Sequence, residues 1–229
     1  MIKVKGVSKK YGRKKVLHDV SFTALPGEIT CLIGINGVGK TTILKIITNL
    51  TPKSGGTITI DGEPLKPKSY ELITFIPDAI PMPPSMTIND AIIFMDDFYK
   101  SWNNERAEEL LLFFKLDRRT KIGDLSKGNT AKVNLLLGLS LDVRYILMDE
   151  PFSGIDIFSR EQITNLFSSG FLEDRGVLIT THEIKDIEHL IDKAVFLDEG
   201  VILKEFKTED MRLQEGKSIE DVMREVYQP

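Results

Sequence analysis

The chain has 229 residues, of which 41% are hydrophobic and 28% are charged, a composition that suits one large soluble domain or two small ones. The net charge of −4 and the isoelectric point near 5.5 argue against a nucleic-acid-binding protein with a broad basic face. The single cysteine, Cys31, excludes an internal disulfide and indicates a reducing, cytosolic setting. No uncharged stretch approaches the ~18 residues of a membrane helix, and the N-terminus lacks an apolar signal core, so we expect no membrane span.

The first part of the chain has the composition of strands, broken by one helical pattern. Short runs rich in β-branched residues flank a turn at residues 11–13, and GEITCLIG is a continuous apolar strand of the kind buried in a parallel sheet. A basic cluster at residues 9–15 reads best as a solvated hairpin turn. In chain order we expect strands at 2–7, 16–25 and 27–34, a helix at 41–50, a strand with turns at 55–65, and a proline-rich loop at 78–85.

The middle of the chain changes character, and strand patterns return after it. Apolar residues with helical spacing predict a helical insertion over residues 87–140. The last two predicted strands are joined by Asp198-Glu199-Gly200, which predicts a hairpin, and Ser218 and Asp221 are spaced as a capping box. The expected helices are 89–99, 104–116, 133–141 and 218–226, and the expected strands are 144–150, 176–183, 193–200 and 201–206.

The most specific motif is GINGVGKT at residues 34–41. Glycines let backbone N–H groups wrap phosphate oxygens in conformations that a side chain would block. The following helix offers its N-terminus to an anion. Lys40 adds a positive charge at the outer phosphates, and the Thr41 hydroxyl can bind Mg²⁺. Because an apolar strand precedes the motif and a helical pattern follows it, the stretch predicts a site for nucleotide phosphates.

A second motif, RYILMDEP, ends an apolar strand in two acids. An acid at the carboxyl end of a strand beside a phosphate-binding loop can hold the magnesium shell, which suits Asp149. The adjacent Glu150 is placed to polarise a water molecule. Such a strand is common by itself, but together with the upstream phosphate loop it indicates a nucleotide hydrolase.

Three further stretches narrow the class: LSKGN at 125–129, FSGID at 152–156, and ITTHE, which contains His182. With these motifs in this order, nearly the whole chain resembles the nucleotide-binding subunit of the ABC ATPase family. The resemblance implies an α/β fold, with a P-loop nucleotide hydrolase core, an N-terminal antiparallel β subdomain and a helical subdomain insertion. It also implies that residues 1–229 form a single ATP-binding domain.

The resemblance further implies roles for individual residues. In the family, two such subunits pair head to tail and hold two ATP molecules between them. Glu150 matches the general base, Asp149 the acid of the magnesium shell, and His182 the histidine at the γ-phosphate, with Lys40 as the catalytic lysine. The positions that match nucleotide-contacting residues are Tyr11 at adenine, Gly34, Asn36, Gly37, Gly39, Lys40, Thr41 and Thr42 in the phosphate loop, and Ser126, Gly128 and Asp156 across the pair.

Some of these residues have simpler alternative roles. Tyr11 could be an aromatic packed in a turn. Ser126 could be the N-cap of the following helix, a role compatible with phosphate binding because both use a helix N-terminus. His182 could be structural, although its place after a predicted sheet strand, beside an acid, favours a role in the site.

Two positions depart from the family pattern. Asp78 stands where the family has glutamine; it is shorter and anionic, but a carboxylate still suits Mg²⁺, so we place it in the metal site with Thr41 and Asp149. Lys127 replaces a signature glycine, and Asn129 replaces a glutamine. We expect the Lys127 side chain to point to solvent; the alternative is a cation near the partner's γ-phosphate.

These observations predict an ATP-binding and ATP-hydrolysing subunit, with ATP and Mg²⁺ as its cofactors, that powers a separate membrane-spanning transporter subunit. Its short C-terminal end resembles those of bacterial export-type subunits. We expect it at the cytoplasmic face of the membrane, paired with a second ATP-binding subunit, identical or different, with no nucleic-acid partner.

The alternative is a cytosolic ABC ATPase with an assembly or regulatory role. Long coiled coils typical of chromosome-associated relatives are missing from the sequence, and an inert binding module is disfavoured because Glu150 and His182 are both present.

Overall fold

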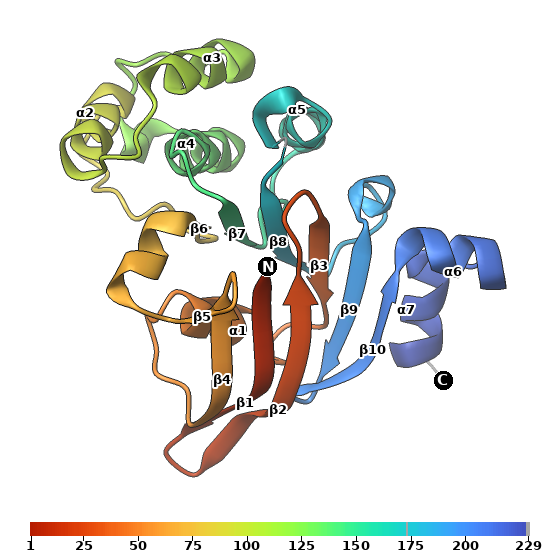
Figure 1. The fold of residues 1–229 in the computed structure, drawn as a ribbon. Coiled ribbons are helices and arrows are strands. Elements are labelled where there is room, and N and C mark those ends of the chain that lie inside the picture. The colour runs from red at the N-terminus through yellow and green to blue at the C-terminus, as the bar shows by residue number, and fades with distance from the viewer. Residues whose placement is uncertain (173, 228–229) are drawn as a thin grey trace.

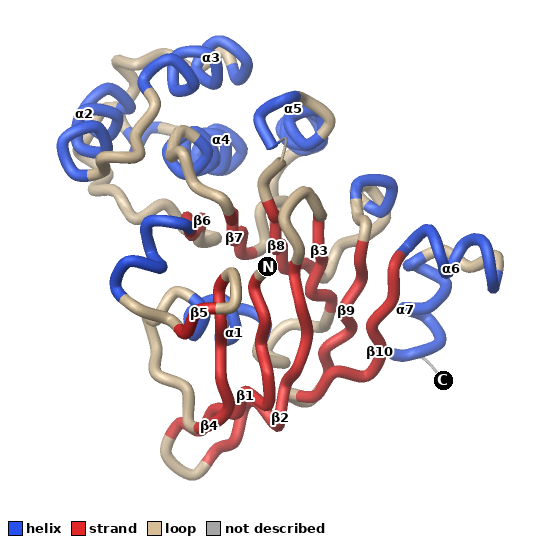
Figure 2. Tube along the Cα trace, viewed as in Figure 1, coloured by secondary structure: helices blue, strands red, loops and turns tan. Residues whose placement is uncertain are grey.

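The computed structural model describes residues 1–172 and 174–227. In it, ten strands form two sheets, and helices cover them and extend to one side (Figure 1). Figure 2 shows the three helices of the predicted insertion gathered on one side of the molecule, with α4 nearest the strands. The strands are β1 (Ile2–Tyr11), β2 (Lys14–Ala24), β3 (Ile29–Ile33), β4 (Gly55–Ile60), β5 (Glu63–Pro64), β6 (Ile73–Ile76), β7 (Tyr145–Asp149), β8 (Gly176–Thr181), β9 (Lys193–Asp198) and β10 (Val201–Lys207).

Seven α-helices and four short 3₁₀ segments complete the described chain. The α-helices are α1 (Lys40–Ile47), α2 (Ile88–Phe98), α3 (Asn104–Phe114), α4 (Lys127–Leu139), α5 (Ile157–Phe167), α6 (Thr208–Glu215) and α7 (Ile219–Tyr227). The 3₁₀ segments are Pro67–Leu72, Ile122–Asp124, Gly170–Leu172 and Glu188–Leu190.

The first sheet is antiparallel, in the order β2-β1-β4-β5, and confirms the predicted N-terminal β subdomain. The second sheet has the order β10-β9-β3-β8-β7-β6, and its five strands from β9 to β6 carry the phosphate loop and both downstream motifs. Strands β9, β3, β8, β7 and β6 pair in parallel, and β10 adds an antiparallel edge. The predicted hairpin forms at this edge, with Glu199 and Gly200 both at positive φ, as a two-residue turn requires.

Successive residues of the parallel strands face different cores. Leu32, Leu147 and Leu178 pack with α1 and the antiparallel sheet, whereas their neighbours Ile33, Met148 and Ile179 pack with the helices on the other face. This alternation explains why the strands are continuously apolar, because both faces are covered. Because β3, β8 and β7 pair in parallel, their carboxyl ends meet at one edge of the sheet. The predicted site residues follow the strands at this edge.

Helices α2, α3 and α4 occupy the region predicted to be a helical insertion, but α4 begins six residues before the predicted start at 133. The reason is a local cap: the Ser126 hydroxyl accepts a hydrogen bond from the Asn129 N–H at 3.2 Å, so the helix starts at Lys127. Helix α1 ends at Ile47, short of the predicted 50, and Asn49 adopts a positive φ beyond it. The sequence interpretation missed β6, α5 and α6.

Candidate nucleotide-phosphate site

The phosphate loop leads from β3 into α1 with its helix N-terminus open. Gly39, the N-cap of α1, has φ 114°, and no side chain caps the helix. Its N–H groups are therefore available to a ligand, and the dipole favours an anion. Lys40 is only 5% exposed, and its Nζ donates to the carbonyl oxygens of Gly34 at 2.6 Å and Ile35 at 3.2 Å. These bonds hold the lysine head inside the loop.

Asp149, at the end of β7, is a buried carboxylate whose nearest hydrogen-bond donors are neutral hydroxyls. Thr41 Oγ1 donates to Asp149 Oδ1 at 3.0 Å, and Thr180 Oγ1 donates to the same oxygen at 2.7 Å. Burial raises the pKa of the Asp149 carboxyl, the two hydroxyls oppose that rise, and the negative charges of Asp78 and Glu150 add to it. This excess of negative charge, together with oxygen donors, suits a hard cation such as Mg²⁺.

The protein supplies only part of a metal shell. Within residues 1–172 and 174–227, no three His, Cys, Asp or Glu side chains form a cluster that could hold a metal ion. Thr41 and Asp149 would hold Mg²⁺ together with phosphate oxygens. This arrangement is typical of magnesium, which usually binds through one or two carboxylates and the phosphates of its substrate.

Glu150 joins Lys40 to His182. Lys40 Nζ lies 3.0 Å from Glu150 Oε1 as an ion pair, and His182 Nδ1 lies 2.9 Å from Glu150 Oε2. Oε1 is buried and receives no directed hydrogen bond from the part of the chain that the structure describes. The backbone of Glu150 has a positive φ of 49°, and its N–H bonds to Thr180 O and to Thr180 Oγ1, both at 3.1 Å. A strained backbone anchored in this way fixes the carboxylate at the strand end.

These groups surround one cavity of about 330 Å³. Each predicted motif contributes a residue to its lining, except LSKGN at residues 125–129, and Tyr11 also lies outside it. Ser153 belongs to it although the sequence interpretation did not select it as a site residue. The lining residues are Asn36, Gly37, Gly39, Lys40, Thr41, Thr42, Asp78, Glu150, Ser153 and His182.

Asp78 lines this cavity from the loop after β6 and is itself exposed to solvent. Burial is the main cause of the raised pKa of the Asp149 carboxyl, and the negative charge of Asp78 adds to it. Its place in the cavity lining is consistent with the expected position of Asp78 beside the metal.

We expect Asp78→Asn to need more Mg²⁺ for half-maximal ATP hydrolysis, because the variant loses a charge that interacts with the cation. Its affinity for metal-free ATP should stay equal or improve, since repulsion between Asp78 and phosphate is relieved. A magnesium titration of the wild type, Asp78→Asn and Asp78→Gln measures this. Should Asp78 only cap its loop, both variants would lose about 1 kcal/mol of stability with an unchanged titration.

Ser126 and Gly128 do not line the cavity, and Gly128 packs against Asp156 and Ser159. A Cβ at Gly128 would lie 2.1 Å from Ser159 Oγ and 2.7 Å from Asp156 Oδ2, so only glycine fits there. Asp156 caps α5, accepting from Ser159 N at 2.9 Å and Ser159 Oγ at 2.7 Å. The LSKGN and FSGID motifs therefore form one continuous surface, outside the cavity of their own chain.

The Lys127 side chain is exposed, as expected, but it folds back over this surface. A Cβ on Gly154 would lie 2.1 Å from Lys127 Nζ, so the ammonium group rests on the FSGID loop. It forms no ion pair with any acidic side chain in residues 1–172 and 174–227.

Tyr11 lies at the end of β1, outside the lining of the phosphate cavity. Its ring is half-exposed, Lys9 Nζ lies 4.5 Å from the ring centroid, and its hydroxyl is 3.5 Å from Thr51 Oγ1. Both the packed-turn interpretation and a base-stacking role fit this placement.

Lys9 belongs to the basic cluster, but it is buried and bonds to the Pro52 carbonyl, so the solvated-turn interpretation is wrong for this one residue.

Two residues that the sequence interpretation missed organise the site. Thr180 hydrogen-bonds to both Asp149 and Glu150. Arg160, on α5, donates to Glu183 and Asp186 and to the Phe152 carbonyl, linking the loop after β8 to the loop after β7. The two threonines before His182 in ITTHE could have indicated Thr180 as a site residue. No motif in the sequence indicated Arg160, which lies on a helix that was not predicted.

Comparison with known proteins assigns the fold and the site to a family. The ABC transporter family profile matches residues 17–153, which include the phosphate loop and both acids of RYILMDEP. The chain belongs to the ABC transporter family. It is 32% identical over 222 residues to the ABC transporter ATP-binding protein YtrB of Bacillus subtilis, covering 93% of this chain and 76% of that protein. This membership makes it an ATP-binding, ATP-hydrolysing subunit.

Two further relatives extend the comparison. The lipopolysaccharide export system ATP-binding protein LptB of Escherichia coli is 30% identical over 214 residues, covering 87% of each chain. The ATP-binding cassette MJ0796, solved as a dimer in a post-hydrolysis state with ADP and phosphate, superposes with a TM-score of 0.78 at 25% identity, covering 90% of this chain and 98% of that one. The ABC fold predicted from the sequence is confirmed. Of the described helices, none has the length and apolar character needed to cross a membrane.

Proposed function

We propose that this ABC subunit binds Mg²⁺–ATP in the 330 Å³ cavity and hydrolyses it with Glu150 as the general base. The observation that supports this most strongly is that Glu150 lies within about 3 Å of both Lys40 and His182, beside an open helix N-terminus. Lys40, Thr41, Thr42 and the loop glycines would hold the phosphates. Thr41 and Asp149 would hold the cation, which neutralises phosphate charge when bound.

Glu150 can act on water only through an oxygen that is free to accept a proton. Its Oε1 faces Lys40 and has no directed hydrogen bond, whereas Oε2 is held by His182. When phosphate draws the Lys40 ammonium group toward itself, Oε1 becomes the available acceptor. His182 keeps the carboxylate oriented, and its second ring nitrogen lies 3.7 Å from Glu183 Oε1.

A second ATP-binding subunit would complete the site. Ser126, Gly128 and Asp156 share one surface that does not reach their own cavity, which is consistent with contacts to ATP held by another copy. The dipole at the N-terminus of α4 also favours an anion, while Ser126 Oγ accepts a hydrogen bond from the Asn129 N–H there. The dimeric structure of MJ0796 supports such a pairing.

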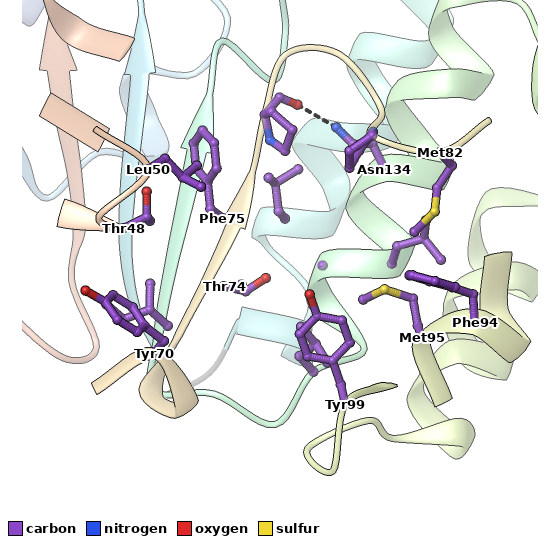
Figure 3. A pocket seen from close by; sticks show the side chains of 17 residues that line it. Thr48, Leu50, Tyr70, Thr74, Phe75, Met82, Phe94, Met95, Tyr99 and Asn134 are labelled. Atoms are coloured by element: carbon purple, nitrogen blue, oxygen red, sulfur yellow. Dashed lines mark hydrogen bonds between the residues drawn. The ribbon is translucent and has the colours of Figure 1, made fainter. Parts of the chain in front are cut away.

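A membrane-spanning partner would bind at an apolar groove between the sheet and α2. The groove has a volume of about 410 Å³ (Figure 3) and continues into a second hollow of about 740 Å³ with which it shares Tyr70, Ile73, Tyr99 and Leu141. Phe98 is 71% exposed beside it and stacks on Phe94 with ring centroids 4.5 Å apart. Such a surface fits the apolar face of an amphipathic helix from the partner.

The direction of transport rests on the relatives. LptB is named as part of an export system, so we infer an exporter, with this subunit bound at the cytoplasmic face of the membrane. The alternative, a cytosolic ABC ATPase with an assembly or regulatory role, shares the whole nucleotide site. The exposed aromatic residues along the groove favour a docked partner over an isolated ATPase.

Copurification from detergent-solubilised membranes tests the proposed partner. We expect the tagged wild type to retain a membrane-spanning protein, and Phe98→Asp to lose it because a charge replaces an exposed aromatic at the groove. Leu112→Asp is the matched control, because Leu112 is 78% exposed on the neighbouring helix α3 and lies outside both hollows. Equal retention by both variants would exclude the groove as the docking surface, and wild type without any membrane protein would favour the cytosolic alternative.

A further inference from the structure

The apolar groove and the phosphate cavity are adjacent along the chain. Pro77 lines the groove, and the next residue, Asp78, lines the cavity. Both follow β6, whose last residue, Ile76, is buried against α4. A displacement of one peptide unit at this point therefore changes both surfaces at once.

Asn134 ties this junction to α4. It is 7% exposed, in a helix segment whose other buried residues are apolar or glycine apart from Lys132, and its Nδ2 donates to the Pro77 carbonyl at 2.5 Å, the dashed line in Figure 3. A buried amide among leucines requires a partner, because an unpaired one costs about 1–3 kcal/mol. The bond therefore specifies where the Pro77 carbonyl lies relative to the helix.

Helix α4 leads from this bond to the proposed subunit surface. Ser126 caps its N-terminus and Gly128 packs on Ser159, while Asn134, Leu137 and Gly138 line the groove two turns further along. Gly138 also packs directly on Ile76, where a Cβ would lie 2.4 Å from Ile76 Cγ1. Such close packing leaves little room for α4 to move without the end of β6.

We propose that Asn134 is a positioning residue: by anchoring the Pro77 carbonyl it sets the place of Asp78 at the metal side of the phosphate cavity. The inference rests on the proposed binding of Mg²⁺–ATP. Two features support it, namely the hydrogen bond itself and the consecutive placement of Pro77 and Asp78 in the two hollows.

The test measures binding without turnover, in a Glu150→Gln background with a fluorescent ATP analogue. Asn134→Leu removes the amide at nearly constant volume. We expect it to raise the Mg²⁺ concentration for half-maximal analogue binding by roughly 3- to 10-fold, the equivalent of one lost hydrogen bond, with binding in EDTA unchanged. Asn134→Ala should shift the titration in the same direction, which guards against a folding defect specific to leucine.

Ser140→Ala is the matched control. Ser140 is also on the α4 side of the core, fully buried, and its Oγ donates to the Leu136 carbonyl at 2.8 Å, but it does not contact Pro77. It should lose comparable stability without any shift in the magnesium titration. A shift in Ser140→Ala as large as that in Asn134→Leu would assign the effect to general destabilisation and overturn the proposal.

A double-mutant cycle with Asp78→Asn separates positioning from structural support. If Asn134 acts through Asp78, Asn134→Leu adds no further magnesium shift once Asp78→Asn is present, whereas independent effects would add. Additive shifts, or no shift in Asn134→Leu alone, overturn the proposal while leaving the proposed function intact. If the parent background binds no analogue with Mg²⁺, the proposed function and this inference both fail.

Discussion

Glu150→Gln is expected to lose nearly all steady-state ATP turnover, by about 10²- to 10⁴-fold, the usual contribution of a positioned base. Glutamine preserves the shape of the side chain and its contact with His182, but it cannot take a proton from water. ATP binding should persist, because Lys40 and the loop amides remain and lose a competing carboxylate. Phosphate release and equilibrium ATP binding, measured on the same preparation, give the two halves of the prediction.

Glu161→Gln serves as its control, because Glu161 is an exposed acid on α5 that does not line the cavity. It should keep wild-type turnover. Near-normal turnover in Glu150→Gln would remove Glu150 from the proposed role.

Glu150→Gln should also form dimers that depend on ATP, because hydrolysis no longer separates the subunits, and light scattering measures this. Monomers at every ATP concentration would instead favour pairing with a different ATPase chain.

Lys40→Met should weaken ATP binding by about 10- to 150-fold, corresponding to the 1.5–3 kcal/mol of a charge-assisted hydrogen bond. The variant also leaves Glu150 without its cation, so an uncompensated negative charge remains where phosphate should bind. The melting temperature of the wild type should rise with added Mg²⁺–ATP, because a ligand stabilises the state it binds. That rise should disappear in Lys40→Met.

Lys45→Met provides the comparison, since Lys45 is an exposed lysine on the same helix, α1, and faces away from the cavity. It should retain the full thermal response to Mg²⁺–ATP. An ATP-dependent rise in Lys40→Met equal to that in Lys45→Met would show that the lysine in the phosphate loop does not bind phosphate.

The nucleotide site was largely predictable because its residues lie in local motifs. GINGVGKT specifies a strand, a turn and a helix within 20 residues of sequence, and the parallel order of β3, β7 and β8 then brings Glu150 and His182 to Lys40. These strands could be predicted as continuous apolar runs because both of their faces are buried. The prediction of fold and family therefore needed no long-range information beyond motif order.

What escaped prediction depends on contacts between distant segments. Strand β6 has only four residues and becomes a strand by pairing with β7, and α5 has a weak apolar pattern with exposed Ile157 and Phe158 in its first turn. The early start of α4 was missed because Gly128 lowers its helix propensity, while the packing of Gly128 on Ser159 requires that residue. Tertiary contacts decide such elements.

The ion pair between Lys40 and Glu150 has a consequence for the end of the catalytic cycle. The two side chains form an ion pair, and both are nearly buried. Under the proposed function, this pair gives the lysine an internal anion as its partner once ADP leaves, which should favour the release of spent nucleotide. The proposed general base would then also help to empty the site and make it ready for the next ATP.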